Sequence, residues 1–102
     1  MMMAFDSSPK PPSRLDDATV AAVREALRHY LGDGADPSAL QGTLQQMSAE
    51  ARAKELRAEQ LLVVLKEVWG SLPEVRAMTD TTAQVRTLQR VVTMCIKEYY
   101  RP

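Results

Sequence analysis

The chain has 102 residues, with 13 basic and 13 acidic side chains and a single cysteine, Cys95. This length favours one domain, the balanced charge gives no overall attraction for nucleic acid or an anionic membrane, and one cysteine excludes a disulfide framework or a cysteine-based zinc site. No apolar run approaches the ~20 residues that cross a bilayer, and the N-terminus lacks the pattern of a secretory signal. We therefore expect a cytoplasmic protein that makes no membrane contact.

Residues 1–14, MMMAFDSSPKPPSR, are predicted to form a disordered tail. Pro9, Pro11 and Pro12 lack backbone donors, and serines add polarity. The PKPP segment is too short to specify a docking motif. A single helical domain is then expected over residues 15–102.

A first helix is expected to begin near Asp16, which can cap it, and to end at Gly32 or Gly34. Leu15 and Val20 have the spacing of a hydrophobic staple. The apolar face of this helix comprises Val20, Val23, Leu27, Tyr30 and Leu31.

A second helix is predicted to start at Asp36-Pro37, because an acid at the cap and proline at the first position favour helix initiation. Its apolar residues, Leu40, Leu44, Met47 and Ala51, recur at intervals of four and three. After Ala51 no glycine or proline occurs until Gly70. Local chemistry therefore permits one helix of ~50 Å from Pro37 to Leu72. That exceeds the width of so small a domain, and we expect a break near residues 55–57.

Residues 61–72, LLVVLKEVWGSL, are the most apolar part of the chain and are predicted to be the helix around which the others pack. Its apolar stripe spans about 120° of a helical wheel and comprises Leu61, Leu62, Leu65, Val68, Trp69 and Leu72. This helical spacing argues against a strand at LLVVL. Val63 and Val64 fall outside the stripe, so they are covered either by the helix that starts at Pro37 or by a second chain, most simply across a two-fold axis.

Pro73 is expected to end this helix, residues 74–78 to form one extra turn, and Thr81 with Gln84 to form a capping box for a last helix over residues 81–100. The predicted inner face of the last helix comprises Val85, Leu88, Val92, Cys95, Ile96 and Tyr99. Four cations, Arg86, Arg90, Lys97 and Arg101, share about 60° of its opposite side. They form either a solvated surface or a site for an acidic partner.

Catalytic patterns are weak. His29 is the only histidine, and the residues three and four positions later are Gly32 and Asp33 instead of the lysine and glycine typical of a phosphotransfer domain. Cys95 lies among apolar residues, where a thiol is usually a core residue. The chain has no phosphate-binding glycine loop and no hydrolase or metalloprotease motif. We expect no enzyme, no catalytic residue, no metal site and no cofactor.

The sequence therefore predicts an all-α fold, a small bundle of about four helices behind a disordered N-terminal tail. The expected function is that of a non-enzymatic interaction protein, either homo-oligomeric, most simply a homodimer, or a small subunit or adaptor of a larger assembly. The candidate partner-binding residues are Val63, Val64, Arg86, Arg90, Lys97 and Arg101. The alternative is a helical nucleic-acid-binding regulator that uses the four cations, which the neutral chain and the lack of interleaved aromatic residues make the weaker hypothesis.

Overall fold

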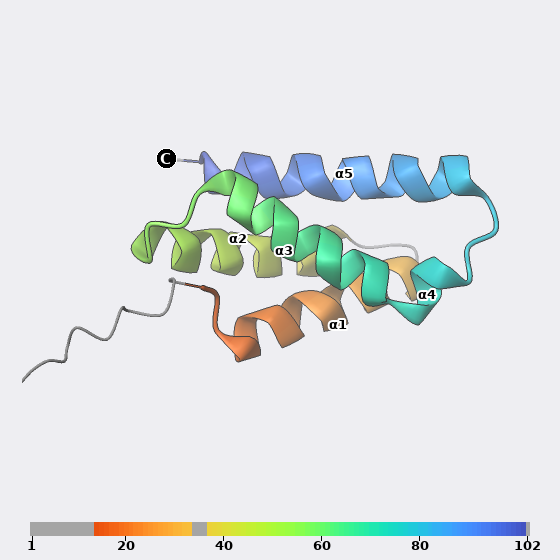
Figure 1. Cartoon of the computed structure of the whole chain (residues 1–102), viewed down its shortest axis with the longest axis horizontal. Helices are drawn as coiled ribbons and strands as arrows, with labels where there is room; N and C mark the ends of the chain where they lie inside the picture. Colours follow the sequence, from red (N-terminus) through yellow and green to blue (C-terminus); the bar gives the residue numbers. More distant parts are fainter. Residues whose placement is uncertain (1–13, 34–36, 102) are drawn as a thin grey trace, which may run out of the picture.

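A computed structural model describes residues 14–33 and 37–101, and all their regular structure is helical (Figure 1). The helices are α1 (Asp17–Asp33), α2 (Pro37–Ala53), α3 (Ala58–Ser71), the single turn α4 (Pro73–Arg76) and α5 (Thr81–Tyr99). The all-α prediction is confirmed, with four long helices. The predicted tail as far as residue 13, Gly34 and the predicted cap Asp36 lie outside the described residues. Within the described ranges no helix is long and apolar enough to cross a membrane.

The four long helices form a four-sided bundle in which α1 and α5 each pack against both α2 and α3. In Figure 1, α3 lies in front of α2, with α5 above and α1 below. The short connections place successive helices in alternating directions, as in other up-and-down bundles. This arrangement gives α3 one side toward the core, and no other helix of residues 14–33 and 37–101 packs against its opposite side.

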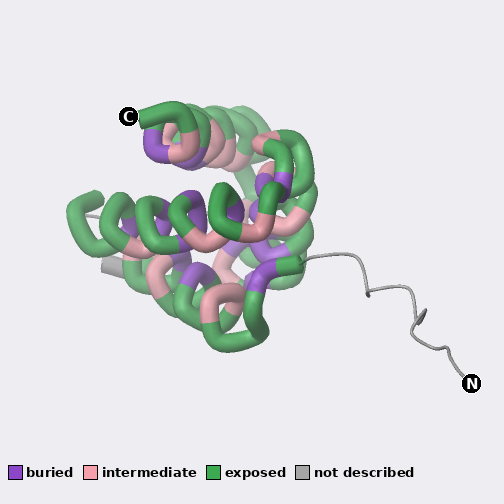
Figure 2. Tube along the Cα trace, turned by 90° about the vertical axis from the view of Figure 1, so that its left-hand side faces the viewer, coloured by how far each residue is buried: buried purple, intermediate pink, exposed green. Residues whose placement is uncertain are grey.

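The core is built from the apolar stripes that the sequence predicts. Val23 and Leu27 of α1 are fully buried, and Figure 2 shows the buried positions gathered on the inner sides of the helices. The other buried predicted residues are Leu40, Leu44, Met47 and Ala51 of α2, and Leu61, Leu65, Val68, Trp69 and Leu72 on or just after α3. Burying each large apolar side chain contributes roughly 1.5–3 kcal/mol, so these stripes account for why the helices associate.

The predicted break between α2 and α3 is confirmed. Glu55 adopts a left-handed conformation with φ of 60°. The N–H of Leu56 donates to the carbonyl of Ala51 at 2.8 Å, and the N–H of Glu55 donates to the carbonyl of Arg52 at 3.1 Å. These two bonds make a Schellman termination, with Glu55 in the position that glycine usually occupies. Leu56, buried in the core, follows as the apolar residue of that motif.

The predicted inner face of α5 is wrong by roughly a quarter of a turn. Of the predicted residues, Val85 and Ile96 are 48% and 37% exposed and Cys95 is buried as expected, whereas Val91 and Glu98, which were not predicted, are buried. Leu88, Val92 and Tyr99 lie at the edge of the buried side. A hydrophobic pattern does not predict this rotation, because it turns a carboxylate inward and two aliphatic side chains outward.

The capping box predicted at Thr81 and Gln84 is also wrong. Asp80 caps α5, and its carboxylate accepts from the N–H of Ala83 at 3.1 Å. The side chain of Gln84 instead donates to the carbonyl of Val75 at 2.9 Å and ties α5 to α4. The predicted cap was therefore one residue late, because Asp and Thr are both good caps, whereas the predicted start of the helix at Thr81 is confirmed. The single turn predicted after Pro73 is confirmed as α4.

Candidate interaction surface

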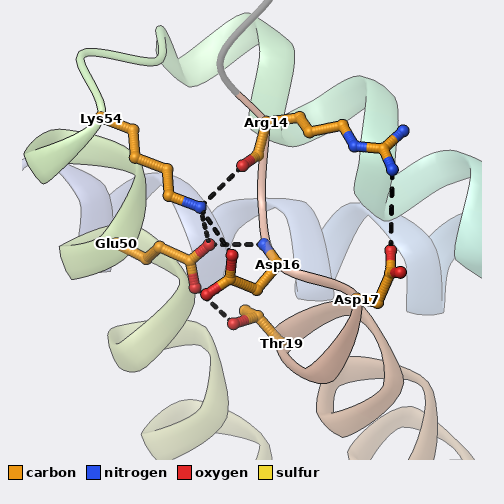
Figure 3. A network of polar contacts seen from close by, with 6 residues as sticks. All are labelled: Arg14, Asp16, Asp17, Thr19, Glu50 and Lys54. Atoms are coloured by element: carbon orange, nitrogen blue, oxygen red, sulfur yellow. Dashed lines mark hydrogen bonds and ion pairs between the residues drawn. The ribbon is translucent and has the colours of Figure 1, made fainter. Parts of the chain in front are cut away.

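A polar network fixes the start of α1 against the end of α2 (Figure 3). Glu50 of α2 accepts hydrogen bonds from the backbone N–H of Asp16 at 2.6 Å and from the hydroxyl of Thr19. Lys54 Nζ lies 2.8 Å from Glu50 Oε2 and 3.0 Å from Asp16 Oδ1, and donates to the carbonyl of Arg14 at 2.8 Å. The carboxylate of Asp16, the predicted cap of α1, is thus directed toward α2.

The network stabilises the charged forms of its members. Burial alone would raise the pKa of Glu50, but the hydrogen bonds from Lys54, Thr19 and Asp16 outweigh it and hold this pKa below its ordinary value. The hydrogen bonds to Glu50 and Asp16 raise the pKa of Lys54. Because the backbone of residues 14–16 is bonded to α2, Leu15 is held in a fixed place beside α3.

A second set of contacts holds the end of α5 against the loop between α2 and α3. The phenol of Tyr99 donates to the carbonyl of Leu56 at 2.6 Å. Arg52 donates to the carbonyls of Tyr99 and Arg101 at 2.8 and 2.9 Å, which satisfies acceptors at the C-terminal end of α5. These bonds place Ile96 and Tyr100 beside the first turns of α3.

Between α3 and the residues that lead into α1 lies an apolar hollow of about 250 Å³. Leu15, Leu56 and Leu61 contribute to its walls, and Val63 and Val64 to its α3 side. Next to it, a second hollow of about 350 Å³ lies between α1 and α3 and shares Leu15 and Val64 with the first. Together the two hollows follow α3 from Gln60 to Ser71 on its α1 side.

On the α5 side of α3 lies a more open hollow of about 530 Å³, whose walls include Leu62, Ile96 and Tyr100. Ile96 is 37% exposed and Tyr100 69% exposed. The outward rotation of Ile96, unexpected from the sequence, adds an aliphatic side chain to this surface.

Val63 stands between the two hollows and is 57% exposed. Val64 is half-buried against the core on the α1 side, and Leu62 is half-buried on the α5 side. We call the surface formed by Leu62, Val63 and Val64, together with the hollows on either side, the α3 face. The cover predicted from the helix that starts at Pro37 is wrong, because no residue of α2 lines the hollows beside Val63 and Val64. No described helix covers Val63, and Val64 is only partly buried against the core.

The four predicted cations of α5 are all exposed. Arg90, Lys97 and Arg101 line one groove of about 530 Å³ between α5, the end of α1 and the start of α2, and Arg86 is not part of it. This groove lies away from the α3 face, so the two groups of candidate partner-binding residues form separate surfaces.

Glu98, which the sequence analysis did not assign to the core, lies in the floor of this cationic groove and is only 3% exposed. Its Oε2 accepts from the amide of Gln41 at 3.1 Å and lies 3.3 Å from the guanidinium of Arg101. The only sequence signal was its place on the α5 wheel near Val91 and Cys95. The carboxylate of Glu98 therefore offsets part of the positive charge of the cations that line this groove.

The two residues considered for chemistry lie apart from both surfaces. Cys95 is buried, and burial raises the pKa of its thiol to about 11, so the thiolate needed for nucleophilic attack is scarce at neutral pH. His29 is exposed on α1 beside Glu25, Arg28 and Glu74. Among the described residues, no three His, Cys, Asp or Glu side chains come together as metal ligands would.

Comparisons of the chain with protein families, with curated proteins and with solved structures find no match.

Proposed function

We propose that this chain is a non-enzymatic helical interaction protein that binds a protein partner through the α3 face. The single observation that carries the proposal is the exposure of Val63 at the centre of an apolar surface that continues into hollows on both sides. One exposed valine is ordinary in a monomer, but a contiguous apolar surface flanked by polar residues is typical of a protein contact.

The construction of the α3 face supports the same function. Hydrogen bonds and ion pairs hold both flanks, through Glu50 and Lys54 on the α1 side and through Tyr99 and Arg52 on the α5 side. A surface that is already rigid loses little conformational entropy when it binds. The single cysteine fits a protein of a reducing compartment, for which we propose the cytoplasm.

The test compares two valine-to-lysine variants, Val63→Lys on the α3 face and Val85→Lys on α5. Both residues are about half exposed, so both variants are expected to fold. Self-association is measured by sedimentation velocity, and bound proteins are identified by affinity capture and mass spectrometry. Val63→Lys is expected to lose an association that Val85→Lys retains. Equal behaviour of the two variants in both assays would contradict the proposal.

A helical nucleic-acid-binding regulator remains the second candidate, because Arg90 and Lys97 are exposed along one groove of α5. The buried carboxylate of Glu98 and its ion pair with Arg101 make the groove less positive than nucleic acid would favour. Contacts to phosphates give a steep fall of affinity with salt, whereas a protein interface gives a shallow one. An Arg86→Glu/Arg90→Glu variant is expected to fold normally. If the protein binds nucleic acid, this variant is expected to bind it more weakly, and its affinity is expected to depend less steeply on salt concentration.

A further inference from the structure

The outward side of α3 carries an ordered arrangement of charge around Val63. Glu59 and Lys66 are both exposed, and both lie on the α5 side of Val63, about 40° and 60° from it on the helical wheel. Gln60 and Glu67 lie at similar angles on the α1 side and are also exposed. Each edge of the helix therefore presents one residue before Val63 and one after it.

This arrangement is complementary to itself when two copies of α3 run antiparallel. A two-fold axis beside Val63 places a residue three or four positions before Val63 opposite one four or three positions after it on the same edge of the other chain. Glu59 then meets Lys66, and Gln60 meets Glu67, to which its amide can donate. Each such contact occurs twice. A parallel pairing would instead bring opposite edges together, so that Glu59 would meet Gln60 and Lys66 would meet Glu67.

Within one chain these charges are little used. Glu59 pairs with Arg57 at 3.2 Å, but both side chains are more than two-thirds exposed, and such pairs contribute little. Over residues 14–33 and 37–101, Lys66 makes no hydrogen bond or ion pair. The folded monomer therefore leaves Glu59 and Lys66 available for a partner.

Building on the function proposed above, we infer that the partner of the α3 face is a second copy of this chain. The two α3 helices pair antiparallel, Val63 meets Val63 near the two-fold axis, and Glu59 of each chain meets Lys66 of the other. The apolar centre supplies the attraction, and the two Glu59–Lys66 contacts fix the register of the antiparallel pair, as charged flanks do in other paired helices.

The test is a charge exchange, with sedimentation equilibrium of the full chain over a range of micromolar concentrations. Wild type is expected to be a dimer. Glu59→Lys and Lys66→Glu are each expected to weaken it by about tenfold, because each turns two attractive contacts into two repulsive ones. The double variant Glu59→Lys/Lys66→Glu restores opposite charges at both contacts and is expected to return to nearly wild-type dimerisation. Circular dichroism and thermal unfolding verify that all variants remain folded.

The failures of the inference and of the proposed function differ. A wild type that stays monomeric throughout would overturn the inference, whereas the proposed function would stand if Val63→Lys still removed another bound protein. A dimer that Val63→Lys leaves intact would place the contact elsewhere and overturn the inference. A double variant as weak as both single variants combined would overturn the antiparallel register.

Discussion

The phenol of Tyr99 donates a 2.6 Å hydrogen bond to the backbone carbonyl of Leu56, a residue 43 positions earlier in the chain. Leu56 belongs to the loop that separates α2 from α3, so this bond joins the end of α5 to the start of α3. It also holds Ile96 and Tyr100 next to Leu62 and so forms one flank of the α3 face.

Removing this bond should lower stability measurably. Tyr99→Phe is expected to reduce the free energy of unfolding by about 1 kcal/mol, because the phenol is lost and the carbonyl of Leu56 keeps no side-chain donor. The matched control is Tyr100→Phe, since Tyr100 is 69% exposed. Urea unfolding should separate the two variants, and an equal effect of both would show that the Tyr99 bond contributes nothing.

Glycine at position 55 should stabilise the protein. Glu55 has a φ of 60°, which a side chain disfavours by roughly 1–2 kcal/mol, and the added flexibility of glycine in the unfolded chain offsets part of this gain. Glu55→Gly is expected to raise the free energy of unfolding by about 0.5–1 kcal/mol. Glu25→Gly, within α1, should lower it by about 1 kcal/mol. A loss of stability in Glu55→Gly would contradict the left-handed termination of α2.

Lowering the pH should reduce the contribution of the Glu50 network to the stability of the fold. The folded-state pKa of Glu50 lies below its ordinary value, so its stabilisation is fully present above that ordinary value and is lost as the pH falls through the folded-state pKa. Glu50→Gln is expected to be less stable than wild type at pH 7, with the difference shrinking below about pH 4. Thermal unfolding from pH 2 to 7 measures it, with Glu25→Gln as the exposed control. A difference independent of pH would show that the charge of Glu50 is not what stabilises the contact.

The inner side of α3 should be intolerant of truncation. Leu65 has no exposed surface, and Leu65→Ala is expected to cost about 2–5 kcal/mol through lost burial and the cavity left behind. That is a large part of the stability of a small domain. Val85→Ala, at an exposed site, is expected to stay within about 0.5 kcal/mol of wild type. A wild-type denaturation midpoint for Leu65→Ala would refute the orientation of α3.

The sequence predicts most of the fold because α1, α2 and α3 follow the helical period closely. Leu40, Leu44, Met47 and Ala51 recur with that period, and all four are buried. The break after α2 followed from an argument about length, although the residue that makes the turn, Glu55, carries no turn signal of its own. In these helices local spacing and tertiary packing agree.

The orientation of α5 depends on residues far apart in the chain, and this part of the prediction failed. Gln41 and Arg101 accommodate the carboxylate of Glu98 at the buried side, and the Tyr99 bond fixes the same rotation. A hydrophobic pattern scores Glu98 as outward and Ile96 as inward, the reverse of what is observed. For the α3 face, the spacing placed Val63 and Val64 off the apolar stripe. The position of Leu15, which lines both α1-side hollows together with Val64, depends on the Glu50 network.

The most direct test of the α3 face as a self-association surface is thiol cross-linking of Val63→Cys. Cys95 is buried and its thiol has a pKa of about 11, so it should not react in the folded protein. With a cross-linker a few ångströms long, Val63→Cys is expected to give a covalent dimer in high yield, while Val85→Cys on α5 remains monomeric. Cross-linking of Val63→Cys no stronger than that of Val85→Cys, at concentrations where the protein associates, would contradict the pairing of α3 with its copy.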